Sequence, residues 1–243
     1  MGAVKSAIGD VVITFLWVFS ASAIGPLTSI ITSSYLPHLQ LGDFFTSVIV
    51  TTLLLFILLF IFTLVGDALG GASFNPTALA SFYAAGLGDD TLLSMALRFP
   101  AQVFGAIGGA WAIREFMPAA YKHMVEGPSL QVDLHSGCIA EGVLTFLITF
   151  VVLLVVLRGP KNSVLQTWLL AMSTVVLVLA GSPYTGPSMN PANAYGWAYL
   201  SNSHNTWEHF YVYWICPFIG AILAAWVFRT VVSAPQPTKE KKP

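Results

Sequence analysis

Charged residues are scarce in this chain, in which Asp, Glu, Lys and Arg together make up 9% of 243 residues. A soluble domain carries roughly 25% charged residues, so the composition argues against a soluble fold. The formal net charge of −1 says little about partners, and no basic patch indicates a nucleic-acid partner. The chain also has no Ser-His-acid arrangement, no glycine-rich phosphate loop and no metal-ligand spacing among its five histidines. We therefore expect no enzyme, no cofactor and no metal site.

Cysteine is scarce as well, with Cys138 and Cys216 as its two occurrences, both in apolar segments. Free cysteine behaves in a core as a small hydrophobic residue. We interpret the two cysteines as packing residues and not as a disulfide. Other small residues are spaced four apart, which predicts close crossing of the helices that carry them. These pairs are Gly105 with Gly109 and Gly220 with Ala224.

Long hydrophobic runs are abundant by contrast, because 56% of the residues are hydrophobic. The run 44–66 holds 23 residues without a charge, enough to cross a hydrocarbon core of about 30 Å. The third run is the weakest candidate, since Arg98 and Arg114 bracket only 15 residues. Six segments are candidate membrane spans: 11–31, 44–66, 99–113, 139–157, 164–181 and 210–228.

The two halves of the chain resemble each other. IGDVVITFL at 8–16 resembles IAEGVLTFL at 139–147, which lies 131 positions later. GAI at 105–107 recurs at 220–222, 115 positions later, and the difference between the offsets indicates a longer first loop at 32–43. Each half, about 1–120 and 130–234, holds three spans, so the second half must insert upside down as in inverted repeats. We expect a single membrane channel domain over 1–234 and a disordered cytosolic tail over 235–243.

The placement of Lys and Arg predicts the orientation. If both termini are cytosolic, eight of these residues lie on the cytosolic side, and only Arg114 and Lys122 lie opposite. Cytosolic loops of membrane proteins carry such an excess of basic residues. We therefore expect a multi-pass protein with both termini in the cytosol.

The most informative feature is a tripeptide that occurs at matching positions of both halves, as Asn75-Pro76-Thr77 and Asn190-Pro191-Ala192. Asn is a preferred helix cap, and Pro is tolerated at the first helical position. A single Asn-Pro pair commonly marks only a turn or a helix start. Each pair here opens an apolar run of about ten residues, which forms a helix of about 15 Å, half of a bilayer core. The repetition therefore predicts two half-helices that enter from opposite sides and meet near the midplane.

The chemistry of such a meeting point favours small neutral molecules. Both helix N-termini would direct their positive dipole ends at one spot. If each Asn oxygen caps its helix, each NH₂ group stays free to donate into the path. A cation would be repelled, and a chain of proton-conducting waters would be interrupted.

These paired motifs and the inverted repeat, with AEGVLTF at 140–146 and PFIGAILAAW at 217–226, resemble the aquaporin or major intrinsic protein family over nearly the whole chain. The resemblance implies an all-α membrane protein of six transmembrane helices plus two re-entrant half-helices. It also implies a passive transmembrane water channel that assembles as a homotetramer in lipid. Thr77, the short N-terminus and the lysine tail resemble the first group of plant small basic intrinsic proteins. That group implies the endoplasmic reticulum membrane.

The resemblance also implies a selectivity constriction, and here the chain departs from the family. Asn193 stands where the family usually has arginine. Pro187 and Val178 are further members of the ring, and either Leu54 or Leu55 completes it from the second span. Such a ring is mostly apolar and lacks a fixed charge. An alternative function is therefore a channel for small neutral solutes such as glycerol, urea or hydrogen peroxide, and another is a largely closed scaffold or adhesion protein.

Two carboxylates, Asp10 and Glu141, occupy equivalent positions of the repeat within or at the edge of the membrane. Acidic residues at this depth are candidates for function. The family resemblance implies that Glu141 supports its re-entrant loop, and Asp10 is a shorter version of the usual glutamate. A proton relay in a proton-coupled transporter is the alternative role.

The C-terminal tail carries Lys239 and Lys241 close to its end. Their spacing resembles a cytosolic dilysine retrieval signal of endoplasmic reticulum membrane proteins. The alternative is ordinary basic charge on the cytosolic side.

Overall fold

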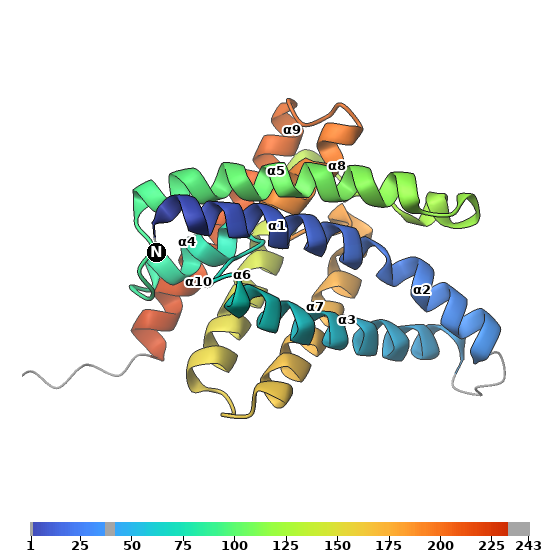
Figure 1. Ribbon diagram of the computed structural model, residues 1–243, viewed down its shortest axis with the longest axis horizontal. Helices are drawn as coiled ribbons and strands as arrows, with labels where there is room; N and C mark the ends of the chain where they lie inside the picture. Colours follow the sequence, from blue (N-terminus) through green and yellow to red (C-terminus); the bar gives the residue numbers. More distant parts are fainter. Residues whose placement is uncertain (1, 37–41, 233–243) are drawn as a thin grey trace, which may run out of the picture.

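The computed structural model describes residues 2–36 and 42–232, and its regular elements in those ranges are all helices (Figure 1). The expected tail at 235–243, with Lys239 and Lys241, lies outside the described residues. The α-helices are α1 Ala3–Ser22, α2 Ile24–Ile30, α3 Asp43–Ala68, α4 Pro76–Ala84, α5 Leu92–Phe116, α6 Leu134–Arg158, α7 Ser163–Thr185, α8 Pro191–Leu200, α9 Trp207–Phe210 and α10 Cys216–Val231. A 3₁₀ helix spans Ala119–Met124, and π-helical turns span Ile31–Tyr35 and Tyr211–Ile215.

Five helical stretches are long and apolar enough to cross a membrane: Ala3–Tyr35, Asp43–Ala68, Leu134–Arg158, Ser163–Thr185 and Trp207–Val231. The sixth long helix, α5, has 25 residues, but the polar side chains of Arg98 and Gln102 and several glycines make it less apolar. The sequence suggested that Arg98 bounds this span, but Arg98 lies inside α5. Its buried guanidinium is tolerated there because it is paired with Asp10 and Asp90 inside the protein.

The first helical stretch also runs further than expected, since 32–35 of the predicted loop is helical. The hydroxyl of Thr32 donates to the carbonyl oxygen of Thr28 at 2.9 Å, and that of Ser33 donates to Ser29 at 2.7 Å. Such bonds to the preceding turn let polar side chains remain within a helix.

The repeat is visible in the packing of the helices. Helix α1 packs along α5 in the first half, and α6 packs along α10 in the second (Figure 1). A Cβ atom on Gly105 would collide with the backbone of Val11, and one on Gly220 would collide with the backbone of Gly142. The small residues at these equivalent positions therefore permit the close crossings that the sequence predicted.

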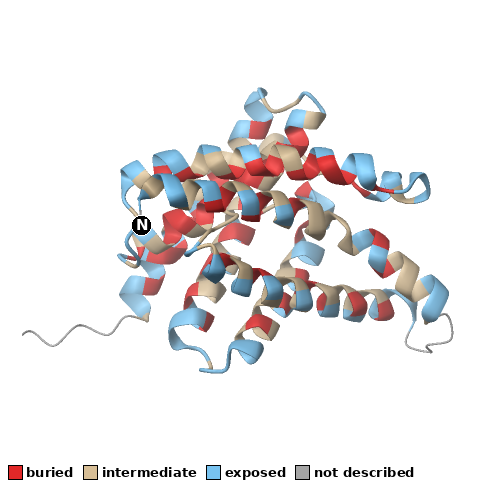
Figure 2. Cartoon of the chain, viewed as in Figure 1, coloured by how far each residue is buried: buried red, intermediate tan, exposed pale blue. Residues whose placement is uncertain are grey.

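Many large apolar side chains are exposed on the outer surface. Buried residues gather on the faces of the helices that pack against one another (Figure 2). Side chains three or four positions apart on α3 share one exposed face, and soluble proteins rarely expose an apolar patch of such length. This face consists of Phe45, Ile49, Leu53, Ile57, Ile61 and Leu64. It requires lipid or another protein as a cover, in agreement with a membrane protein.

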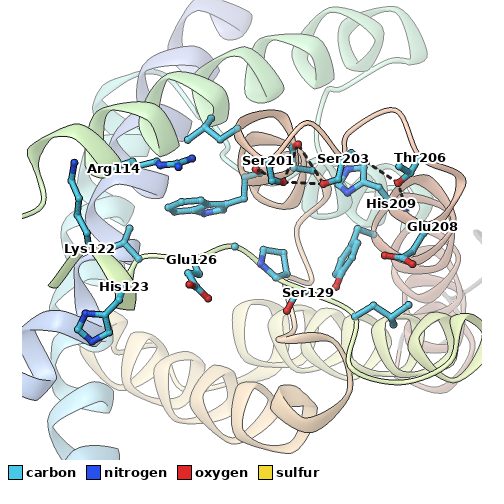
Figure 3. A pocket seen from close by; sticks show the side chains of 18 residues that line it. Arg114, Lys122, His123, Glu126, Ser129, Ser201, Ser203, Thr206, Glu208 and His209 are labelled. Carbon is cyan, nitrogen blue, oxygen red and sulfur yellow. Dashed lines mark hydrogen bonds between the residues drawn. The ribbon is translucent and has the colours of Figure 1, made fainter. Parts of the chain in front are cut away.

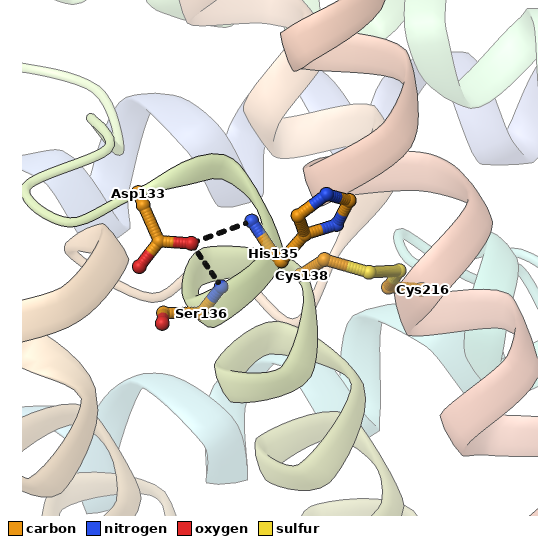
Figure 4. Close-up of a disulfide and its surroundings, with 5 residues drawn as sticks. All are labelled: Asp133, His135, Ser136, Cys138 and Cys216. Carbon is orange, nitrogen blue, oxygen red and sulfur yellow. Dashed lines mark hydrogen bonds between the residues drawn. A yellow bond between two sulfur atoms is a disulfide. The ribbon is translucent and has the colours of Figure 1, made fainter.

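Cys138 and Cys216 form a disulfide that joins the start of α6 to the start of α10, with Cα atoms 5.6 Å apart (Figure 4). The interpretation of these cysteines as separate packing residues is therefore wrong. Sequence reasoning treated each as a small hydrophobic residue, and could not know that Gly142 and Gly220 bring the two helices into contact.

Next to the bridge, Asp133 caps α6 by accepting from the backbone N–H groups of His135 and Ser136. Hydrogen bonds from Ser136 hold the pKa of Asp133 below its usual value.

Candidate channel site

The two Asn-Pro motifs start the two short helices, as the sequence predicted. The Asn75 side chain precedes the nine-residue α4 and accepts from the backbone N–H of Thr77 at 3.0 Å. Asn190 precedes the ten-residue α8 and accepts from the N–H groups of Ala192 and Asn193 at 3.1 and 3.2 Å. Pro76 and Pro191 occupy the first position of each helix, where no backbone donor is needed.

The two motifs contact each other through reciprocal hydrogen bonds. Nδ2 of Asn75 donates to the carbonyl oxygen of Met189 at 3.0 Å, and Nδ2 of Asn190 donates to that of Phe74 at 2.9 Å. Each acceptor directly precedes the Asn of the opposite motif. The expectation that both amide hydrogens stay free is therefore corrected, because one hydrogen of each amide holds the other loop.

Backbone strain accompanies this contact in the second motif. Met189 has a φ angle of 49°, which a side chain larger than glycine rarely adopts. Its N–H donates to Glu141 Oε2 at 3.1 Å, and its carbonyl oxygen accepts from Asn75. Bonds on both sides hold the residue in this conformation, as is typical of strained residues at functional sites.

Asp10 lies fully buried beneath the first motif and is hydrogen-bonded on both oxygens. Its Oδ1 accepts from the N–H of Ser73 and from Nη2 of Arg98, both at 2.8 Å. Its Oδ2 accepts from Nε of Arg98 at 2.8 Å and from Nε2 of Gln102 at 2.9 Å. The carboxylate thus ties α1, α5 and the re-entrant loop together. Sequence reasoning did not anticipate these partners, because it took Arg98 as a boundary of the third span and did not single out Gln102.

Glu141 lies equally buried beneath the second motif, and its partners differ. Its Oε1 accepts from the N–H of Ser188 at 2.8 Å and from the hydroxyl of Thr185 at 3.2 Å, while Oε2 accepts from Met189. No basic side chain in the described ranges pairs with it. The hydroxyl of Tyr213 completes this corner by donating to the carbonyl oxygen of Thr185 at 2.9 Å.

Aromatic residues support the loop in front of the first motif. The ring of Phe74 stacks on Trp17, with centroids 4.1 Å apart, and meets the edge of Phe62 at 5.9 Å. Trp17 and Phe62 also contact each other edge to face at 5.3 Å. This cluster fixes the peptide group that accepts from Asn190. Its members were not identified from the sequence, where aromatic residues are common in all spans.

The residues assigned to the constriction lie around the second motif and on α3 and α7. Nδ2 of Asn193 donates to the hydroxyl oxygen of Ser188 at 3.1 Å. Pro187 packs against Gly181, because a Cβ added to Gly181 would collide with the proline ring. Val178 lies on α7 about one turn before Gly181, with 37% of its surface exposed. Leu55 is buried in a cluster with Ala171 and Val175, whereas Leu54 is half-buried.

A hollow of about 660 Å³ lies at the far end of α8 (Figure 3). Trp197 from α8, the segment 125–130 and Tyr213 contribute to its wall. Charged and polar side chains surround it at both ends: Arg114, Lys122, His123, Glu126, Glu208 and His209. Because Tyr213 also contacts Thr185, the hollow adjoins the corner that supports the second motif.

Comparison with known proteins decides the family. The family model described as major intrinsic protein matches residues 1–228. The chain belongs to the major intrinsic protein family. It is 60% identical over 243 residues to aquaporin SIP1-1 of Zea mays, covering 100% of this chain and 98% of that one. It is 57% identical to aquaporin SIP1-1 of Oryza sativa subsp. japonica, with coverage of 100% and 98%, and 52% identical to aquaporin SIP1-1 of Arabidopsis thaliana, again with 100% and 98%.

The fold is also that of a solved major intrinsic protein. The X-ray structure of the aquaglyceroporin from Plasmodium falciparum superposes with a TM-score of 0.70 at 19% identity, covering 96% of this chain and 98% of that chain. This likeness confirms the expected all-α fold of six transmembrane helices with two re-entrant half-helices, α4 and α8. Major intrinsic proteins are membrane channels for water or small solutes, and the chain is accordingly a channel and not an enzyme.

Proposed function

We propose that this major intrinsic protein is a passive water channel whose path runs between Asn75 and Asn190. The observation that carries this proposal is the reciprocal bonding of the two motifs, Asn75 to Met189 and Asn190 to Phe74. It joins the N-termini of two half-helices and leaves each amide one further hydrogen to donate. A neutral path with two fixed donors and two positive helix ends suits water and opposes cations. The name aquaporin, which the relatives carry, supports the same substrate.

For the constriction we propose Asn193, Pro187, Val178 and, from α3, Leu54. The burial of Leu55 against Ala171 and Val175 favours Leu54, which is half-buried, as the member of the ring. The hydroxyl of Ser188 donates its one hydrogen to the carbonyl oxygen of Asn190 at 2.8 Å, so it accepts from Nδ2 of Asn193. The carbonyl oxygen of the Asn193 side chain is then directed away from Ser188. The ring would thus offer an acceptor among apolar groups, where an arginine would offer a fork of charged donors.

A second candidate function is a channel for small neutral solutes such as glycerol, urea or hydrogen peroxide. The feature that favours it is the apolar ring without a fixed charge. Stopped-flow light scattering of proteoliposomes tests both candidates when the external osmolyte is varied. A water channel accelerates shrinkage with every osmolyte, whereas a solute channel also shows rapid reswelling with the permeant one. A closed scaffold or adhesion protein shows neither effect.

A proton-coupled transporter would need a carboxylate that can exchange protons. Asp10 accepts four hydrogen bonds and Glu141 accepts three, from groups that belong to the loops and neighbouring helices. These bonds support a role for both acids in holding the loops. The rival predicts solute uptake driven by a pH gradient, which a passive channel does not show.

We further propose a homotetramer in the endoplasmic reticulum membrane, with both termini cytosolic, a channel domain over 1–234 and a tail over 235–243. The exposed apolar face of α3 supports a lipid or subunit contact. The disulfide supports the orientation, because Cys138 lies near the end of α6 that would then face the lumen, an oxidising compartment. Native mass spectrometry in detergent tests the assembly, and protease access to a tag at either terminus tests the orientation.

A further inference from the structure

The two halves of the repeat hold their re-entrant loops with equivalent residues of different chemistry. Ser73 and Ser188 lie 115 positions apart, and each donates its backbone N–H to the acid beneath its loop at 2.8 Å. On the third span of each half, Arg98 and Tyr213 are also 115 positions apart. Arg98 donates to the carbonyl oxygen of Gly71 at 2.9 Å, and Tyr213 donates to that of Thr185 at 2.9 Å. Equivalent positions therefore both donate to a backbone carbonyl oxygen ahead of the Asn-Pro motif, with a guanidinium in one half and a phenol in the other.

The difference follows from the length of the acid. Glu141 reaches two consecutive backbone N–H groups, those of Ser188 and Met189. Asp10 is shorter by one methylene, and its loop bond is to Ser73. The acceptor capacity that remains on the aspartate is taken up by the paired bonds from Nε and Nη2 of Arg98 and by the bond from Nε2 of Gln102. Such a bidentate pair fixes both partners in one plane.

All the donors of Arg98 are used. Besides Asp10 and Gly71, its Nη1 donates to both carboxylate oxygens of Asp90 at 3.0 Å. Arginine has five N–H donors and cannot lose its proton in proteins, and the bonds to Asp10, Gly71 and Asp90 account for each of them. The side chain is buried, so its removal would leave the carboxylate of Asp10 without a counter-charge.

We propose that Arg98 positions the first half-helix for permeation, and that Asp10 and Arg98 form one unit that a Glu and a Tyr can replace, as in the second half. Arg98 is thus a positioning residue that acts through Gly71 and Ser73 on Asn75. This inference rests on the proposed channel function.

The repeat itself supplies the rescue variant for a test. We would compare wild type with Arg98→Tyr, Asp10→Glu and the double variant that carries both changes, in proteoliposomes at matched protein density. Each single variant should lose most of the osmotic water permeability. Arg98→Tyr leaves the buried carboxylate of Asp10 without its counter-charge, and Asp10→Glu overfills a closed site. The double variant should regain permeability, because it reproduces the second half, where Glu141 accepts from the loop N–H groups and Tyr213 donates to the carbonyl oxygen of Thr185. Arg98→Lys should not, because a single ammonium cannot bond both Asp10 oxygens and Asp90 in this geometry.

A matched control is Arg158→Tyr, which changes an exposed arginine that donates to the carbonyl oxygen of Val232. It should leave permeability unchanged. Full permeability in Arg98→Tyr, or a double variant no better than the singles, would overturn the proposal. If a single variant does not fold, the double variant still tests the proposal. A double variant that folds and restores the water permeability of the vesicles would support it, and one that does neither would overturn it.

Failure of the channel function itself would give a different result. Wild-type vesicles would then shrink no faster than empty ones. The unit of Asp10 and Arg98 would in that case be judged by thermal unfolding. The double variant should have a higher Tm than either single variant, and an equal or lower Tm would overturn the exchangeable unit.

Discussion

Asn190 donates one amide hydrogen to the carbonyl oxygen of Phe74, at a distance of 2.9 Å across the two halves of the chain. The reciprocal bond runs from Asn75 to Met189. Each asparagine therefore caps its own half-helix with its oxygen and holds the opposite loop with its nitrogen. The two bonds thus join the two halves of the repeat at their motifs, and a change in one motif should affect the other.

Asn190→Ala should disturb both halves at once. The N–H groups of Ala192 and Asn193 and the carbonyl oxygen of Phe74 would lose their partner, and a buried group left unpaired costs about 1–3 kcal/mol. Denaturant unfolding should show this loss, and osmotic permeability should fall sharply. Asn162→Ala is the matched control, because Asn162 caps α7 on the surface through Leu165. It should lose about 1 kcal/mol of cap stability but keep its permeability, and a parallel loss of flux would contradict the central role of Asn190.

Thr77→Ala should weaken the first motif without closing the path. The hydroxyl of Thr77 donates to the side-chain oxygen of Asn75 at 2.7 Å. In the second motif, the side-chain oxygen of Asn190 accepts instead from a second backbone N–H, that of Asn193. Its loss should cost about 1 kcal/mol, measured as a lower unfolding midpoint. Permeability should be largely kept, since Ala192 fills this position in the second motif. Thr77→Ser retains the hydroxyl and serves as the control, and an equal loss in both variants would assign the effect to the methyl group.

Asn193→Arg should narrow the pore and tighten its selectivity. Arginine would bring a fixed positive charge and a fork of donors to a ring of otherwise apolar residues. A cation would meet an added electrostatic barrier, and glycerol would meet a steric one, whereas water passage should fall less. The measurement is the ratio of glycerol to water permeability in proteoliposomes. An unchanged ratio, or complete exclusion of glycerol by the wild type, would show that Asn193 does not set selectivity.

The disulfide predicts that the purified protein has no reactive thiol. Because the two cysteines of the chain are paired with each other, a maleimide-polymer reagent should label neither one unless the protein is first reduced. Cys138→Ser should release one labelled thiol at Cys216. Loss of the bridge should lower the free energy of unfolding by about 2–4 kcal/mol. Labelling of the unreduced wild type in denaturant would contradict the disulfide.

The tail predicts localisation. Replacement of Lys239 and Lys241 by serine should let part of the protein leave the endoplasmic reticulum while permeability stays unchanged. Microscopy of fluorescent fusions in cells checks this, with Lys242→Ser as the control for a simple loss of basic charge. Unchanged localisation of the double variant would remove the tail as the retrieval signal.

Local sequence signals predicted much of the fold. The Asn-Pro motifs predicted the starts of α4 and α8. The four-residue spacing of Gly105 with Gly109, and of Gly220 with Ala224, predicted the close crossings, because caps and small residues act over short distances. The repeat predicted which helices are equivalent. These features can be predicted without knowing which side chains contact each other across the helical bundle.

Partners on different helices could not be predicted in this way. Arg98 looked like a boundary of the third span, since nothing in its neighbourhood along the chain shows that Asp10 lies 2.8 Å away. The disulfide was misread for the same reason, because Cys138 and Cys216 are 78 positions apart. The support of Phe74 by Trp17 likewise depends on contacts between separate helices.

Osmotic shrinkage of proteoliposomes, followed by light scattering at matched protein density, tests most directly whether water passes between the two asparagines. Wild-type vesicles should shrink much faster than empty ones with an impermeant osmolyte, and their rate should depend only weakly on temperature. Vesicles with Asn190→Ala should approach the rate of empty liposomes, while those with Asn162→Ala should match the wild type. Equal rates for wild-type and empty vesicles, or an undiminished rate for Asn190→Ala, would contradict the account.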